Sequence, residues 1–393
     1  MKEHFFNNFS ALENPNSAGE GSFPFTGGSA IPTLRFHRSI PGYRETSLVS
    51  MQCAANKYRV DSIFVKDESS RFGLNAFKGL GGSYCMFRIL CEKIGLDAES
   101  ADYADFLKDD IRKACGEIEF VTATDGNHGK GVSWAAKLFG CKARVFLPRG
   151  SVEARRKAIE DAGSATAEIT ELNYDDTVLY AASLAKKNGW ILIQDTSFEG
   201  YEKPPRWIIE GYLTMAAEAS EQMKGKTPTH IFLQAGVGAM AGGIASYYLD
   251  LLKDKKPFIT VVEPRDAACI YRSVLLSDGK AHTVPGDPVT IMAGLNCGTP
   301  CGLAWPVLRD HSAIFCACDD IITKDGMRSY ARPLMTDPKV ISGESGAVTY
   351  GLLLTVLNSA QLRELFKITE RSVILLINTE GDTDPEGYRS IVL

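Results

Sequence analysis

The sequence predicts an α/β protein built on two open, mainly parallel, twisted sheets flanked by helices. From residue 46 onward, strand-like apolar runs alternate with helical segments, a pattern typical of parallel strand pairing. The length of 393 residues exceeds what one core usually organises, which predicts two domains. Because the units between residues 117 and 194 are short, we predict a small domain at 81–195 inserted into a large domain formed by 1–80 and 196–393.

The elements follow in chain order. Residues 1–45 are rich in Asn, Ser, Gly and Pro, which predicts an extended arm with short strands, and a first helix is predicted at 46–57. A strand at 62–66 leads to a helix that begins near Lys78 and ends near Cys91, followed by a polar surface excursion at 97–110. Further strands are predicted at 117–122, 142–147, 166–170, 190–194, 230–234, 258–263, 313–317 and 373–377. Further helices are predicted at 128–139, 152–162, 174–187, 207–223, 242–252, 323–332 and 346–358.

Charge, hydropathy and cysteine content exclude several classes of protein. A formal net charge of −5 argues against a nucleic-acid-binding protein, which would carry a basic face. No apolar run approaches the roughly 20 residues that span a bilayer, and residues 1–8 lack the apolar core of a signal peptide. Ten cysteines in so long a chain form no disulfide framework, and Cys316 and Cys318 are interpreted as buried thiols rather than metal ligands. We therefore expect a cytoplasmic protein with no metal, membrane or nucleic-acid partner.

Lys78 lies at the predicted junction of a strand and a helix, among Gly73, Gly79, Gly81 and Gly82. Because glycine has no Cβ, the backbone there can approach a ligand closely. A lysine desolvated beside a helix N-terminus has a lowered pKa and becomes an amine nucleophile. Most lysines are instead solvated surface charges, and this stretch alone does not separate the two interpretations.

A second glycine-rich stretch, Gln234–Gly243, joins a predicted strand to a predicted helix. Backbone N–H groups at the positive end of a helix predict a phosphate site there. A tight turn without a ligand is one alternative. A dinucleotide site is another, because Gly236-x-Gly238-x-x-Ala241 matches the Rossmann fingerprint and Glu263 ends the next strand, where a ribose-binding acid is expected.

A third stretch, Thr122–Gly129, also joins a strand to a helix and offers N–H groups to an anion such as a substrate carboxylate. Asn127 within it can bond to a substituent of an aromatic ring. A dehydrogenase needs neither a second anion loop nor a lysine among glycines. A pyridoxal phosphate enzyme needs a lysine, a phosphate loop and a carboxylate loop. The three stretches together favour pyridoxal 5'-phosphate as cofactor and a small amino acid as substrate.

The motifs resemble those of the fold-type II pyridoxal phosphate enzymes, which include the serine and threonine dehydratases and tryptophan synthase β. The resemblance spans roughly residues 40–393, with the motifs in family order. Four segments carry it, namely the lysine motif Asn75–Gly79, the Gly-Asn-His-Gly loop Gly126–Gly129, the phosphate loop Gly236–Gly243 and the ring-nitrogen segment Asn378–Asp382.

Within this superfamily the chain is most similar to the diaminopropionate ammonia-lyases. The similarity rests on Thr124–Gly129, on Gln194-Asp195-Thr196 and on Thr379–Asp384. Dehydratases usually carry Ser or Thr where Asp125 stands and Arg where Leu80 stands. The resemblance implies a homodimeric enzyme that splits 2,3-diaminopropionate by α,β-elimination into pyruvate and two ammonia molecules.

The resemblance also implies roles for individual residues. It assigns catalysis to Lys78, Asp125 and Asp195. Cofactor contacts are implied for Lys78, Phe77, Asn127, Gly236, Val237, Gly238, Ala239, Met240 and Thr379, and substrate contacts for Thr124, Asp125, Gly126 and His128. The alternatives are a serine or threonine dehydratase, an NAD-dependent oxidoreductase, and a regulator that binds pyridoxal phosphate or an amino acid without turnover.

The two acids suggest how the chemistry is divided. An acid beside a carboxylate-binding loop repels its ligand, so Asp125 needs another role. It can pair with the β-ammonium group of diaminopropionate or take the α-proton. Asp195 can approach from the opposite face, and two acids on opposite faces let one site deprotonate both enantiomers; a helix N-cap is the alternative for Asp195. Thr379 stands where the family places a hydroxyl opposite the ring nitrogen, which leaves that nitrogen largely unprotonated.

Overall fold

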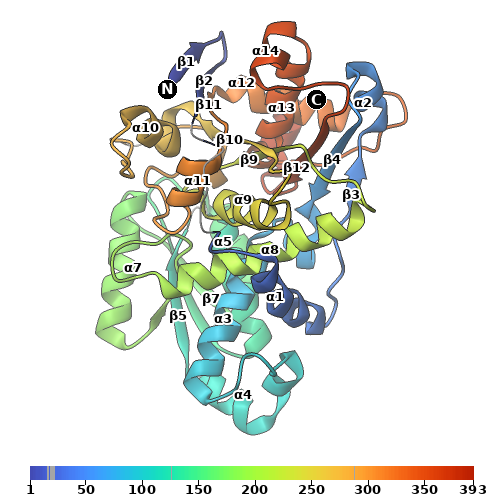
Figure 1. The fold of residues 1–393 in the computed structure, drawn as a ribbon. Helices are drawn as coiled ribbons and strands as arrows, with labels where there is room; N and C mark the ends of the chain where they lie inside the picture. Colours follow the sequence, from blue (N-terminus) through green and yellow to red (C-terminus); the bar gives the residue numbers. More distant parts are fainter. Residues whose placement is uncertain (16, 18–22, 125, 287) are drawn as a thin grey trace. The chain divides into compact units, whose positions relative to one another are not determined.

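The computed structural model describes residues 1–15, 17, 23–124, 126–286 and 288–393, and the chain forms two compact units (Figure 1). The large unit comprises Met1–Gly27, Glu45–Ser70 and Met215–Leu393, and the small unit comprises Gly28–Arg44 and Arg71–Thr214. Each unit contains one sheet of mainly parallel strands, which confirms the predicted fold class. The units differ from the predicted domain boundaries at residues 28–44, 71–80 and 196–214, all of which group with the small unit.

Helix packing accounts for the different boundaries. The first part of α8 (Lys203–Gln222) packs on α3 (Lys78–Ile94), where a Cβ on Gly81 would lie 2.6 Å from the ring of Tyr212. Helix α1 (Gly27–Ser39) also contacts α3, and His37 Nε2 donates to Leu80 O at 3.1 Å. These contacts hold 28–44 and 196–214 to α3, so both segments belong with the small unit.

The structure corrects two predicted elements near the N-terminus. The predicted extended arm contains α1 as well as the strands β1 (Lys2–Phe5) and β2 (Phe9–Glu13). The helix predicted at 46–57 is instead a short strand, β3 (Leu48–Ser50), followed by α2 (Gln52–Tyr58). Residues 48–50 are extended because they pair antiparallel with β4, and this pairing outweighs the local helix propensity.

The large unit is built on an eight-stranded sheet with the order β1-β2-β11-β10-β9-β12-β4-β3. Its inner strands β11, β10, β9, β12 and β4 are parallel, and antiparallel strands lie at both edges. The remaining strands are β4 (Ser62–Asp67), β9 (His230–Gln234), β10 (Phe258–Pro264), β11 (Ile314–Cys318) and β12 (Val373–Asn378). Its other helices are α9 (Ala239–Leu251), α10 (Cys269–Leu276), α11 (Trp305–His311), α12 (Asp320–Ala331), α13 (Glu344–Leu357), α14 (Ala360–Leu365) and α15 (Pro385–Val392).

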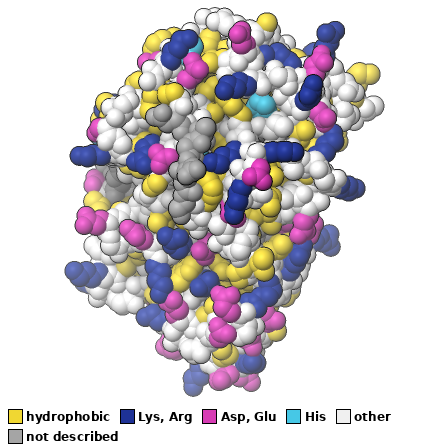
Figure 2. Space-filling view, viewed as in Figure 1, with side chains coloured by type: hydrophobic (Ala, Val, Ile, Leu, Met, Phe, Trp, Pro, Cys, Tyr) yellow, Lys and Arg dark blue, Asp and Glu magenta, His cyan; other side chains and the backbone are white. Residues whose placement is uncertain are grey.

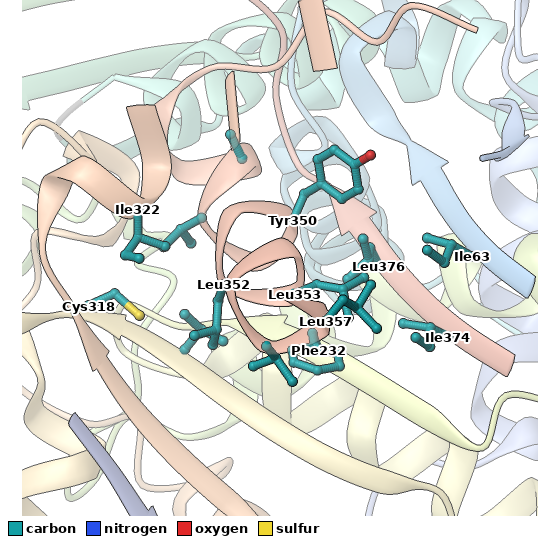
Figure 3. Close-up of a cluster of buried hydrophobic side chains, with 14 of the residues drawn as sticks. Ile63, Phe232, Cys318, Ile322, Tyr350, Leu352, Leu353, Leu357, Ile374 and Leu376 are labelled. Atoms are coloured by element: carbon teal, nitrogen blue, oxygen red, sulfur yellow. The ribbon is translucent and has the colours of Figure 1, made fainter. Parts of the chain in front are cut away.

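Helix α13 supplies much of the core of the large unit. It is apolar almost all round, as expected for a helix covered on every side. Figure 3 shows its side chains lying beside residues of β4, β9 and β12; the labelled residues include Leu352, Leu353, Leu357, Ile63, Phe232, Ile374 and Leu376. This packing fixes the parallel strands whose carboxyl ends carry the candidate site residues of this unit.

The small unit is built on four parallel strands in the order β7-β6-β5-β8. The strands are β5 (Glu119–Ala123), β6 (Lys142–Leu147), β7 (Ala165–Ile169) and β8 (Ile191–Leu192). The helices besides α1, α3 and the first part of α8 are α4 (Asp109–Gly116), α5 (Asn127–Phe139), α6 (Glu153–Ala162) and α7 (Tyr174–Asn188). The predicted excursion at 97–110 contains a 3₁₀ turn, Tyr103–Leu107, and the first residues of α4.

The surface charges and the burial of the cysteines agree with what the composition predicts. On the face shown in Figure 2, basic and acidic side chains are interspersed. Within the described ranges, no helix combines the length and the apolarity needed to traverse a bilayer. The same residues contain no cluster of three or more His, Cys, Asp or Glu that could hold a metal ion. Cys316 and Cys318 are buried on β11, as the sequence predicts.

A fully buried ion pair lies in the large unit. Lys66 of β4 donates to Glu218 Oε2 at 2.6 Å, to Thr46 O at 2.7 Å and to Gln222 Oε1 at 3.0 Å. The side chains of Lys66 and Glu218 are both 0% exposed. Because solvent cannot replace a lost partner at this depth, each charge depends on the other.

We expect Glu218→Gln to lower the free energy of unfolding by about 3–5 kcal/mol, because it leaves a buried ammonium without its counter-charge. Urea unfolding of the wild type and the variant measures the loss. Glu92→Gln is the matched control, since Glu92 pairs with Lys203 at an exposed position and should cost under about 1 kcal/mol. If the two substitutions lowered the free energy of unfolding equally, the contribution of an ion pair would not depend strongly on its burial.

Candidate active site

Lys78 is the first residue of α3 and follows β4 through a turn in which Asn75 has a positive φ of 59°. Its ammonium group forms an ion pair with the carboxylate of Asp195 and is only 18% exposed. The rings of Phe77 and Tyr212 lie close to it, with centroids 5.3 and 5.8 Å from Nζ. A lysine confined by two aromatic rings and one acid matches the description of a positioned amine better than that of a surface charge.

Close crossing of α3 and α5 holds the backbone of Lys78 in place. A Cβ on Gly131 of α5 would lie 3.0 Å from the carbonyl carbon and oxygen of Lys78, and a Cβ on Gly82 would lie 3.3 Å from Gly131. Glycine at these positions lets the two helices approach to backbone contact. The glycines around Lys78 therefore serve helix packing, in addition to any approach of a ligand.

Asp195 follows β8, and a network of hydrogen bonds fixes the segment that carries it. Tyr201 Oη donates to Leu192 O at 3.0 Å and accepts from Gln194 N at 2.8 Å. The Gln194 side chain accepts from Thr122 Oγ1 and Ala123 N, at 3.0 and 3.1 Å, which ties this segment to the end of β5. The alternative of a helix N-cap for Asp195 is wrong, because the next helix, α8, begins at Lys203.

His128 lies beside the same acid. Its Nε2 donates to Ile193 O at 2.9 Å, which leaves Nδ1 facing Asp195 Oδ2 at 3.9 Å. Burial lowers the pKa of His128, so the imidazole is neutral near pH 7. Burial alone would raise the pKa of Asp195, but the charge of Lys78, the neighbouring His128 and hydrogen bonds to the carboxylate together outweigh it and lower that pKa to about 2. The site therefore pairs an ionised acid with the lysine ammonium.

This pKa shift predicts a stability difference in acid. An aspartate with a folded pKa of about 2 and an ordinary unfolded pKa near 3.9 stabilises the fold above about pH 4, and this contribution disappears as the pH falls toward 2. For the protein freed of cofactor, urea unfolding between pH 5 and 2.5 should show a steeper decline in wild type than in Asp195→Asn. The excess should be on the order of 2 kcal/mol. If the free energy of unfolding fell equally in wild type and Asp195→Asn, the ion pair would not stabilise the fold.

The loop before α5 carries the predicted carboxylate-binding residues. Thr124 Oγ1 accepts from Gly126 N at 3.0 Å and from Gly129 N at 3.2 Å, so this hydroxyl organises the loop itself. Gly126 has a φ of +151°, and Asn127 begins the helix. Asp125 lies outside the described residues. Lys78, Phe77, Thr124, Gly126, Asn127, His128 and Asp195 all belong to the small unit.

The predicted phosphate loop, Gly236, Val237, Gly238, Ala239 and Met240, joins β9 to the 13-residue helix α9 in the large unit. Gly238 has a φ of +88°, and a Cβ there would lie 2.8 Å from Ile270. The carbonyl group of Val237 points to the protein, because Cys301 N donates to it at 2.7 Å. The first N–H groups of a helix lack partners within it, so this turn is suited to an anion such as a phosphate.

The structure excludes the ribose-binding role considered for Glu263. Its two carboxylate oxygens accept from Ile270 N and Tyr271 N, at 2.8 and 2.7 Å, and so cap α10. Burial raises the pKa of Glu263 to about 8, although the backbone hydrogen bonds oppose the shift. A buried acid bound to a helix terminus cannot reach a ribose.

Thr379 follows β12 and is buried in the large unit. Its hydroxyl lies 3.1 Å from Gln234 Nε2, at the end of the neighbouring strand β9. A ring-nitrogen partner needs such a fixed hydroxyl, so the residues present fit a pyridoxal ring as well as its phosphate.

Comparison with known proteins decides the family. The family model described as pyridoxal-phosphate dependent enzyme matches residues 40–380. Diaminopropionate ammonia-lyase of Salmonella typhimurium is 45% identical over 91% of this chain and 90% of its own length, and that of Escherichia coli K12 is 46% identical over 95% and 94%. The chain belongs to the diaminopropionate ammonia-lyase family of pyridoxal-phosphate dependent enzymes. It is a lyase, so the oxidoreductase and regulator alternatives are wrong, and its cofactor is pyridoxal 5'-phosphate.

Solved structures of this ammonia-lyase family share the fold. The Escherichia coli enzyme in complex with D-serine has a TM-score of 0.90 at 44% identity, and covers 98% of this chain and 96% of its own. The same enzyme in complex with an aminoacrylate-PLP azomethine reaction intermediate has a TM-score of 0.90, also at 44% identity, with 99% and 97% covered.

Sequence reasoning assigned no role to three residues of the candidate site. Tyr212 lies within a long helix, where an aromatic residue is typical of any core, and Tyr201 precedes that helix without a motif. A role for Gln194 could have been inferred from the sequence, since this residue stands directly before Asp195. Its position at the end of a strand that neighbours β5 predicts a link between strand ends, but only the structure shows which atoms it joins.

Proposed function

We propose that this chain catalyses the α,β-elimination of one ammonia from 2,3-diaminopropionate, after which water hydrolyses the eliminated product to pyruvate and a second ammonia. The ion pair between Lys78 and the buried carboxylate of Asp195 carries the proposal, because it supplies an amine and an acid side by side. Lys78 would bind the cofactor aldehyde carbon, and the amine released from it would act as a base assisted by Asp195. The bound cofactor supplies an electron-withdrawing ring that acidifies the substrate α-proton.

The other predicted residues complete the proposed site. Gly236, Val237, Gly238, Ala239 and Met240 would hold the phosphate, and Phe77, Asn127 and Thr379 the ring. Thr124, Gly126 and His128 would orient the substrate carboxylate through the loop before α5. Asp125 would pair with the β-ammonium group, which distinguishes a diamino acid from serine or threonine, and would take the α-proton of one enantiomer.

A product assay tests this function. Purified enzyme with pyridoxal phosphate should release pyruvate and ammonia from D- or L-diaminopropionate, with two ammonia molecules for each pyruvate. Serine and threonine should react much more slowly, since neither brings a second ammonium group to Asp125. A faster reaction with serine or threonine would instead indicate a dehydratase.

We also propose that the enzyme is a homodimer in the cytoplasm. Most of the cysteines are buried thiols, which suits a reducing compartment. The dimer rests on the family resemblance, and light scattering on the purified holoenzyme tests it. A monomeric mass at micromolar concentration would contradict the proposed assembly.

A further inference from the structure

Gln234, the last residue of β9, makes directional contacts with the neighbouring strand β12. Its side chain is almost fully buried, and its Nε2 lies 2.9 Å from Ile377 O and 3.1 Å from Thr379 Oγ1. The carbonyl of Ile377 can only accept, so the group facing it must be the amide NH₂. The orientation of the Gln234 amide is therefore determined by chemistry.

This orientation constrains the Thr379 hydroxyl. The two N–H bonds of the Gln234 amide have different acceptors: one is Ile377 O, and the other is Thr379 Oγ1. The Thr379 oxygen accepts from Gln234, and its own proton is left to donate in another direction. A threonine without such a neighbour can rotate and act as donor or acceptor.

The arrangement has a cost that packing does not explain. Gln234 Oε1 is buried and has no hydrogen-bond partner among the described residues. A buried oxygen without a partner typically lowers the free energy of unfolding by about 1–3 kcal/mol. Methionine would fill a similar volume without leaving a buried oxygen unpaired.

We propose that Gln234 is a positioning residue that fixes Thr379 as a hydrogen-bond donor to the ring nitrogen of pyridoxal phosphate. This rests on the proposed placement of Thr379 at that nitrogen. A pyridine nitrogen accepts a hydrogen bond only when it is unprotonated, so a fixed donor excludes the protonated ring. Gln234 thereby keeps the ring a mild electron sink, which suits elimination more than reactions through long-lived carbanions.

The test uses holoenzyme loaded with pyridoxal phosphate that carries ¹⁵N at the ring nitrogen. The ¹⁵N chemical shift reports protonation directly, and free cofactor above and below the pKa of its ring nitrogen provides reference values. Wild type should show an unprotonated, hydrogen-bonded nitrogen. In Gln234→Glu the carboxyl group can accept a hydrogen bond from the Thr379 hydroxyl, whose oxygen then faces the ring nitrogen as an acceptor, so the resonance should move toward the protonated value.

Two further variants separate the causes. Thr379→Val should move the resonance to that of an unprotonated nitrogen without a hydrogen bond, and in that background Gln234→Glu should have no further effect. If Thr379→Val leaves the shift unchanged, Thr379 does not contact the nitrogen and the proposed site itself fails. If Thr379→Val moves the resonance but Gln234→Glu does not, only the role of Gln234 is overturned.

Gln234→Met covers the case in which a buried carboxyl group prevents folding or cofactor binding. Without the amide, the Thr379 hydroxyl can rotate, so the resonance should move toward that of Thr379→Val. A wild-type shift in folded, cofactor-loaded Gln234→Met would overturn the inference. The ratio of kcat to KM should fall in the same variants mainly through kcat, since Gln234 is proposed to act on the cofactor rather than on substrate binding.

Discussion

Lys78→Ala is expected to abolish pyruvate formation from diaminopropionate. The substitution removes the amine that is proposed to bind the cofactor and to act as a base, and it leaves the buried Asp195 without its cation. The glycine loop at α9 lies elsewhere in the sequence and should still retain some cofactor without a covalent bond. A pyruvate assay combined with titration of pyridoxal phosphate measures both effects, and near-wild-type turnover would remove the central assignment.

Lys78→Arg is the matched control for this experiment. Arginine restores a positive charge beside Asp195, so the variant should fold and keep the acid ionised. A guanidinium group stays protonated and forms no Schiff base, so turnover should remain absent. Recovery of activity in Lys78→Arg would mean that the charge at this position matters and the amine does not.

The second large effect concerns the two acids. Asp125→Asn should lose activity on one enantiomer of diaminopropionate, which we expect to be D, by about 10²–10⁴-fold, a range typical of a lost general base. Asp195→Asn should mainly affect the L form, because its carboxylate pairs with Lys78, the proposed base for that isomer. Pyruvate formation from each enantiomer measures the selectivity.

A distant aspartate provides the control for this comparison. Asp325→Asn changes an exposed acid that pairs with Arg328, and it should leave both activities unchanged. Equal and modest losses on both isomers in Asp125→Asn and Asp195→Asn would mean that these acids only shape the pocket. The assignment of the substrate would then depend on similarity to relatives alone.

The sequence predicts elements best where one local signal dominates. The strands at 230–234 and 142–147 have the predicted bounds, because apolar runs between polar turns have few other uses. Helix α1 escaped prediction since it begins with two glycines and contains Pro32, and distant contacts stabilise it. The ring of Phe36 stacks on Phe87 with centroids 4.2 Å apart, and His37 Nδ1 lies 2.6 Å from Thr214 Oγ1.

In the candidate site too, local motifs could be predicted from the sequence, but contacts between distant residues could not. Lys78 and Asp195 could each be selected from motifs, since both follow predicted strands. Their ion pair joins residues 117 positions apart, and its geometry depends on Gly131, Tyr201 and other residues without a motif of their own. Side-chain contacts of this kind follow from packing of the whole unit, which the sequence pattern does not resolve.

Covalent mapping of the cofactor identifies the lysine that forms the Schiff base. Holoenzyme is treated with borohydride, which reduces a Schiff base to a stable secondary amine, and its tryptic peptides are analysed by mass spectrometry. We expect one pyridoxyl-phosphate label, on Lys78. A label on any other lysine, or a fully active holoenzyme whose Lys78 peptide stays unlabelled, would contradict the assignment of Lys78.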